Sequence, residues 1–132
     1  CMSLNKNYLV NIIKAALAED LGQGDITSQL TIPAAAQAEM ALVARQELVV
    51  CGMDVPQAVF AQLDASVSVK NHVTDGALVK AGTTLCTITG NARMLLAGER
   101  TALNIMQRMS GVATLTHKYV EAVKGTNAII LD

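Results

Sequence analysis

The spacing of apolar residues changes along this chain from a helical period to an alternating one and back, and that order constrains the fold most. In residues 8–19, apolar positions recur at steps of three and four, which predicts an amphipathic helix with Leu9, Ile12, Ile13, Ala16 and Leu17 on one face. A longer helix is predicted for residues 92–109, where Gly98 would let a neighbouring element approach closely. We expect Ser110-Gly111 to interrupt it and a second helix to run from about 112 to 123.

The segments between these helices have the alternating period of strands. Residues 38–45, 48–51, 66–73 and 84–89 are predicted strands, with Gln46-Glu47 as the turn between the first two. Residues 55–63 are predicted to form a short helix, capped by the Asp54 carboxylate. Residues 22–28 are expected to form a turn with Asp25 as a cap, and 75–82 to hold a short extended piece between two turns. The fold class is therefore α+β with a small mixed sheet.

The apolar segment 127–131 differs from the other predicted strands. It is apolar throughout, as in strands buried inside parallel sheets, and Asp132 would stand at its carboxyl end. Such a strand needs neighbours on both sides, and the sequence supplies none. We therefore expect a larger domain to be cut off at Asp132.

Composition and charge exclude several classes of function. Hydrophobic residues make up 52% of the chain but aromatic residues only 2%, so no stacking platform for bases is expected. The net charge is −1 and the cations are scattered, which argues against nucleic acid as a partner. The apolar runs are too short to span a membrane and no signal segment is visible, so we predict a cytoplasmic protein. Cys51 and Cys86 are expected in the core, and no metal-binding spacing occurs.

A polar stripe on the long predicted helix is the best candidate for chemistry. Arg93, Arg100 and Gln107 recur every seven residues, and Asn104 lies one turn beyond Arg100. A guanidinium fork can bind a carboxylate or phosphate through two parallel hydrogen bonds, so Arg100 could hold an anion. The same spacing also fits a solvated polar face, and spacing alone favours that interpretation because most charged positions on helices are simply exposed. Arg93 and Arg108 could line the same surface.

Other candidate residues lack the surroundings that chemistry would need. His72 and His117 have no carboxylate or cysteine at useful spacing. The loop 22–27 has neither the strand-loop-helix setting nor the lysine of a phosphate-binding loop. Residues 75–90 also resemble half of a lipoyl or biotinyl carrier module, but Lys80 sits in a connecting segment, not at a hairpin tip. We expect only shared β architecture there.

An ordered set of motifs resembles the quinolinate phosphoribosyltransferase family, also called nicotinate-nucleotide pyrophosphorylase (carboxylating). The strongest is Glu99-Arg100-Thr101-Ala102-Leu103-Asn104 followed by Ser110-Gly111-Val112-Ala113-Thr114. The other segments appear in the matching order from about residue 17 onward: Glu19-Asp20-Leu21-Gly22-Gln23-Gly24-Asp25-Ile26-Thr27, Ala44-Arg45, Cys51-Gly52, Asp75-Gly76, Gly90-Asn91-Ala92-Arg93, Gly125-Thr126 and Leu131-Asp132.

The resemblance implies a two-domain glycosyltransferase. Residues 1–111 would be its hammerhead-like α/β sandwich domain, and 112–132 the connecting helix and first strand of an α/β barrel. The family joins quinolinate to phosphoribosyl pyrophosphate with Mg²⁺, giving nicotinate mononucleotide, CO₂ and pyrophosphate in NAD biosynthesis. It works as a homodimer in which each amino-terminal domain faces the partner's barrel.

Only Arg100 is carried over as a site residue. Its position matches the family arginine that reaches into the partner's site and holds a quinolinate carboxylate. Asp132 matches the aspartate that opens a later basic motif and is expected to be structural. The catalytic residues, and those that bind Mg²⁺, would follow Asp132, so we expect the 132 residues alone to be inactive. A related enzyme associated with molybdenum transport is the nearest alternative.

Overall fold

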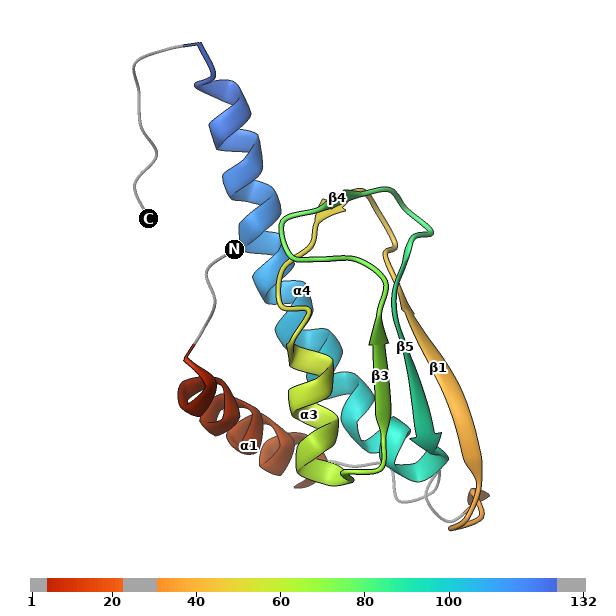
Figure 1. The fold of residues 1–132 in the computed structure, drawn as a ribbon. Coiled ribbons are helices and arrows are strands. Elements are labelled where there is room, and N and C mark those ends of the chain that lie inside the picture. Colours follow the sequence, from red (N-terminus) through yellow and green to blue (C-terminus); the bar gives the residue numbers. More distant parts are fainter. Residues whose placement is uncertain (1–4, 23–30, 126–132) are drawn as a thin grey trace.

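The computed structural model describes residues 5–22 and 31–125. Within these residues, three helices lie against one face of a small antiparallel sheet (Figure 1). The elements are α1 (Lys6–Gly22), β1 (Gln37–Val43), β2 (Leu48–Val49), α3 (Val55–Leu63), β3 (Ser68–Asn71), β4 (Leu78–Val79), β5 (Thr84–Asn91) and α4 (Ala92–Ala122). The predicted α+β class is confirmed.

The main sheet has the strand order β1-β5-β3, with both pairs antiparallel. Ile88 in the central strand lies opposite Met40 of β1 and Val69 of β3, and all three face the core. In the next row, Glu39, Thr89 and Ser68 are exposed. Because side chains alternate between the two faces of a strand, this register gives the sheet one apolar face, which the helices cover.

Helices α1 and α3 pack together beside α4 (Figure 1). The buried residues of α1 are Leu9, Ile13 and Leu17, one helical turn apart, so the predicted apolar face is confirmed in a narrower form. Ile12 lies at its margin and is 36% exposed. In α3, which has the predicted bounds, Phe60 is fully buried.

Helix α4 corrects the prediction of two helices. It is a single helix of 31 residues that passes through Ser110-Gly111 without a break. The Ser110 hydroxyl is bound to the backbone of Cys51, and Gly111 faces open space. One glycine costs a helix only about 1 kcal/mol, too little to end a helix that tertiary contacts hold. The predicted boundary between residues 111 and 112 therefore lies inside α4, and the division into domains stays a prediction.

The second sheet consists of β2 and β4 alone. Gln46-Glu47 therefore separates strands that belong to different sheets, and it does not close a hairpin. The predicted extended piece in residues 75–82 is confirmed as β4, between Gly76 and Gly82, which both have φ near +89°. Glycine adopts this left-handed conformation without steric cost.

Helix ends show which capping predictions hold. Asp54 precedes α3, but its side chain makes no capping hydrogen bond, so that expected role is wrong. Asn91 caps α4, because its side-chain oxygen accepts from the amides of Arg93 and Met94. The expected turn at 22–28 with its cap Asp25, and the expected strand at 127–131, lie outside the described residues. No helix among the described residues is long and apolar enough to cross a membrane.

Candidate functional site

The predicted polar stripe of α4 is present on its solvent side. Arg100, Asn104, Gln107 and Arg108 are all exposed. The opposite side of α4 packs into the core through Leu95, Ala102 and Met106, which are almost fully buried. The helix thus separates an apolar face from a polar one that carries two arginines.

Arg93 does not belong to this exposed stripe. It is half-buried, and its Nε donates a hydrogen bond of 2.8 Å to the carbonyl oxygen of Ile32. The Asn91 side-chain amide binds the carbonyl of Ala34 in the same way, at 2.6 Å. Arg93 and Asn91 therefore attach the segment before β1 to the start of α4. The hypothesis that Arg93 lines the anion surface gains no support from this geometry.

Two contacts fix the turn of α4 that carries Arg100. Gly98 lies against α3 so closely that a Cβ there would be 2.6 Å from Cε1 of Phe60. The predicted close approach at Gly98 is thereby confirmed. Thr101 is 1% exposed, and its Oγ1 donates to Oδ2 of Asp20 in α1 at 2.5 Å. Arg100 therefore stands on a well-held turn while its own side chain is exposed.

The guanidinium of Arg100 makes no hydrogen bond and no ion pair within residues 5–22 and 31–125, and the same holds for the side-chain amide of Asn104. One turn of helix separates the two residues, so both can face the same ligand. An unpaired fork with an amide beside it can bind a carboxylate through several hydrogen bonds. Such a pair suits a small anionic ligand.

Ser110 and Thr114, in the neighbouring motif, form structural hydrogen bonds with the backbone. The Ser110 hydroxyl accepts from the amide of Cys51 and donates to its carbonyl, both at 3.1 Å. Thr114 Oγ1 accepts from the amide of Val49 at 3.0 Å and donates to the carbonyl of Ser110. The two side chains thus provide hydrogen-bond partners for the backbone of β2 and of Cys51 just after it. Gly52 lies close to the same helix, since a Cβ there would be 2.8 Å from Sδ of Met109.

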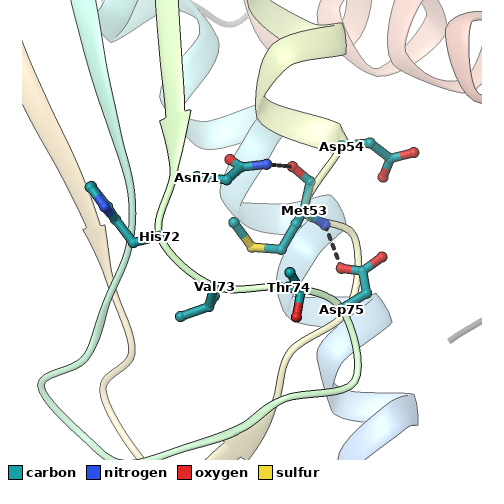
Figure 2. A pocket seen from close by; sticks show the side chains of 7 residues that line it. All are labelled: Met53, Asp54, Asn71, His72, Val73, Thr74 and Asp75. Atoms are coloured by element: carbon teal, nitrogen blue, oxygen red, sulfur yellow. Dashed lines mark hydrogen bonds between the residues drawn. The ribbon is translucent and has the colours of Figure 1, made fainter.

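A shallow surface hollow of about 430 Å³ lies away from this stripe, lined by Met53, Asp54, Asn71, His72, Val73, Thr74 and Asp75. Figure 2 shows Asn71 and Asp75 turned toward the backbone of Met53. Asn71 donates to the carbonyl of Met53, and Asp75 accepts from its amide. Two carboxylates and no arginine or lysine line the hollow, so it would repel an anion. We interpret it as a junction between two loops.

Within residues 5–22 and 31–125, the remaining titratable groups do not form a catalytic cluster. Burial raises the pKa of the Cys86 thiol to about 11, which leaves it protonated and unreactive near neutral pH. The hydroxyl and the amide of Ser66 donate to Asp64 and lower the pKa of that exposed carboxyl, which belongs to a turn after α3. The imidazole Nε2 of His72 forms a hydrogen bond of 2.8 Å with the Thr87 hydroxyl. Both cysteines predicted in the core, Cys51 and Cys86, are buried.

Taken together, the sheet, its helical cover and the cationic stripe define a small α+β domain suited to presenting an arginine to an anion. The family model for the quinolinate phosphoribosyl transferase N-terminal domain matches residues 25–110, more than half of the chain. The chain belongs to this family, as the resemblance predicted.

Individual relatives agree with the family match. A Mycobacterium leprae protein named nicotinate-nucleotide pyrophosphorylase (carboxylating) is 42% identical over 123 residues, which cover 91% of this chain and 43% of that protein. A mitochondrial quinolinate phosphoribosyltransferase from Nicotiana tabacum is 37% identical and is covered to 33% of its length, against 86% of this chain. The crystal structure of NadC from Streptococcus pyogenes is 36% identical with a TM-score of 0.84, covering 91% of this chain and 44% of that one.

The chain thus spans about a third to less than half of the length of these relatives. They favour the quinolinate family over the molybdenum-associated enzyme and the carrier module. Sequence reasoning missed the hydrogen bond that Asp20 accepts from Thr101, and the bonds of Ser110 to Cys51 and of Thr114 to Val49. The signal was present, since all three residues lie within motifs that carry the resemblance.

Proposed function

We propose that this chain is the amino-terminal part of a quinolinate phosphoribosyltransferase. The intact protein would convert quinolinate and phosphoribosyl pyrophosphate into nicotinate mononucleotide, CO₂ and pyrophosphate in NAD biosynthesis. The family match supports this reaction, and the names of the relatives refer to the same activity. In this proposal the 132 residues supply a substrate-binding group and have no activity alone.

One observation carries the assignment of Arg100 as a quinolinate-binding residue. Its fork is exposed and unpaired within the described residues, on a turn that two tertiary contacts hold. Quinolinate carries two carboxylates, so cationic forks can both bind and orient it. Neighbouring motif residues such as Thr101, Ser110 and Thr114 already have structural hydrogen bonds. Arg100 is therefore the motif residue best placed for a ligand.

The proposal includes a homodimer in which the Arg100 face of one subunit meets the barrel of the other. The exposed position of Arg100 on α4 supports this, since an arginine there can reach a second molecule. Farther along α4, the side chains of Val112, Leu115 and Tyr119 are more than half exposed, and we propose that the barrel domain packs there. Sedimentation of the intact protein checks the dimer; a monomer with full activity would contradict it.

Mg²⁺ and the cellular location are further parts of the proposal. No group of three or more histidine, cysteine, aspartate or glutamate residues in the described part could hold a metal ion. We therefore assign Mg²⁺ binding to residues of the intact protein outside it and derive no step through the ion. We also propose a cytoplasmic location, although the tobacco relative is named as mitochondrial. Fractionation of cells that produce the intact protein tests the location.

The decisive test is formation of nicotinate mononucleotide by the intact protein, with quinolinate compared with nicotinate. We expect turnover of quinolinate only. Arg100→Ala should lower kcat/KM for quinolinate about 100-fold, because the loss of a charge-assisted hydrogen-bonded pair costs about 3 kcal/mol. Arg100→Lys should lower kcat/KM less than Arg100→Ala does, since lysine keeps the charge but not the fork.

Two variants serve as controls in the same assay. Lys14→Ala removes an exposed cation from α1 and should leave kcat/KM unchanged. Arg108→Ala tests whether the second exposed arginine belongs to the site, because it lies two turns from Arg100 on the same helix. Wild-type kinetics in Arg100→Ala would remove the assigned role, and absence of quinolinate turnover in the wild type would remove the proposed function.

A further inference from the structure

The hydrogen bond between Asp20 and Thr101 joins the carboxyl end of α1 to the turn of α4 that carries Arg100. The donor and acceptor are 81 residues apart in the sequence and 2.5 Å apart in the fold. Thr101 is 1% exposed and Asp20 is half-buried, so water has little access to the bond. A hydroxyl that donates to a carboxylate makes one of the stronger hydrogen bonds in proteins.

The buried hydroxyl of Thr101 could have formed a hydrogen bond without Asp20. A threonine inside a helix can donate to the carbonyl four residues earlier, as Thr114 does to Ser110 at 2.6 Å in the same helix. Thr101 binds a carboxylate from another helix instead. The bond therefore fixes how α4 is rotated relative to α1, which a local bond would not do.

The rotation of α4 determines the direction of Arg100. Gly98 packs on Phe60 of α3 on one side, and Thr101 is held by α1 close by. At 100° per residue these two contacts lie 60° apart around the helix, and Arg100 lies about 100° or more from both. Both contacts therefore help to set the direction in which this turn of α4 presents Arg100.

Asp20 does not act on Arg100 by charge pairing. The described part of the chain contains no ion pair between them, and the Asp20 carboxylate is directed to Thr101. The guanidinium fork therefore stays available for a ligand.

We propose that Asp20, acting through Thr101, is a positioning residue that sets the direction in which Arg100 meets a carboxylate of quinolinate. This inference rests on the proposed function. Asp20 touches no substrate in this account. Its contribution is to keep the fork aligned, and misalignment of a binding group weakens substrate positioning even when the group itself is present.

The test uses the intact protein and measures KM separately for quinolinate and phosphoribosyl pyrophosphate. Asp20→Ala and Thr101→Val should each raise KM for quinolinate by about tenfold and leave KM for phosphoribosyl pyrophosphate unchanged. Thr101→Ser keeps the hydroxyl and should behave like the wild type. Asp20→Asn keeps an acceptor oxygen, so its KM for quinolinate should lie between those of the wild type and Asp20→Ala. Glu19→Ala removes the neighbouring exposed carboxylate and should leave both KM values unchanged.

A double-mutant cycle separates positioning from a general loss of stability. In the Arg100→Ala background, Asp20→Ala should cause no further rise in KM for quinolinate, because both changes act through one group. Additive effects would overturn the inference, as would variants with a lower Tm but wild-type KM values.

Hydrogen exchange provides a second readout that does not depend on turnover. Asp20→Ala should speed amide exchange in residues 98–104 more than in residues 112–120, because only the first segment is held by α1. If Asp20→Ala raised the amide exchange rate equally in both segments, the positioning role would be overturned. Failure of the proposed function would appear differently, as a wild-type protein that does not turn over quinolinate.

Discussion

The two halves of α4 have similar apolar content but opposite surroundings. In residues 92–110, Leu95, Ala102 and Met106 are buried against the sheet and α3. In residues 111–122, Val112 is 68% exposed and Leu115 is 53% exposed. Figure 1 shows this second half extending beyond the sheets and the other helices. One helix thus contains a half that is buried in the core and a projecting half with exposed apolar side chains, in which the Thr114 hydroxyl still accepts a hydrogen bond from Val49.

The difference in packing between the two halves explains where a binding residue can be placed. An arginine needs a rigid support to orient a ligand, and residues 92–110, the held half of α4, provide that support. Arg100 lies there, between the contacts of Gly98 and Thr101. The projecting half instead presents apolar side chains, which suit packing against another domain.

The largest expected contrast comes from the same substitution in each half. Leu95→Ala should lower the free energy of unfolding of the 132-residue chain by about 3 kcal/mol. The Leu95 side chain is only 3% exposed, so its removal leaves a cavity in the core. Leu115→Ala should change it by less than about 0.5 kcal/mol, since that side chain is already hydrated. Urea unfolding measures both. Equal losses would mean that the two halves do not differ in packing.

A smaller effect is expected at the junction of the two halves. Ser110→Ala removes both hydrogen bonds to the backbone of Cys51 and should cost about 2 kcal/mol. Ser68→Ala on β3 is the control, because that hydroxyl is exposed, and it should stay within about 0.5 kcal/mol of the wild type. Thermal unfolding compares the two. A Tm for Ser110→Ala as high as that of the control would argue against a structural role for Ser110.

Two glycine substitutions should have effects of opposite sign in the two halves. Gly98→Ala places a methyl group 2.6 Å from Cε1 of Phe60, so overpacking should destabilise the chain by about 1–3 kcal/mol. Gly111→Ala meets open space in a helical position and should stabilise the chain by about 0.5 kcal/mol. Circular dichroism during urea unfolding detects both. Destabilisation by Gly111→Ala would contradict the open space found beside Gly111.

The sequence predicted those parts of the fold in which periodicity and packing agree. Helix α3 has its predicted bounds, and the apolar face of α1 and the close approach at Gly98 are confirmed. The continuity of α4 was not predictable from local rules, since Ser110-Gly111 weakens a helix locally while the hydrogen bonds to Cys51 compensate from another part of the chain. Pairing of β2 with β4 depends equally on residues distant in the sequence.

The candidate site shows the same limit. Helical spacing placed Arg100 and Asn104 on one stripe, and both are exposed as that spacing predicts. Spacing also put Arg93 on this stripe, but Arg93 binds the carbonyl of Ile32, a partner 61 residues away. The bond from Thr101 to Asp20 spans a still longer separation. Contacts of this kind depend on the tertiary fold, and the periodicity of the sequence does not predict them.

Equilibrium binding of quinolinate to the intact protein tests the central claim most directly, namely that the held half of α4 presents Arg100 to a carboxylate. Isothermal calorimetry should give a Kd that rises about tenfold or more in Arg100→Ala and less in Arg100→Lys, because only arginine supplies the fork. The Lys14→Ala control should bind as the wild type does. An unchanged Kd in Arg100→Ala would contradict the account and return Arg100 to the role of a solvated surface residue.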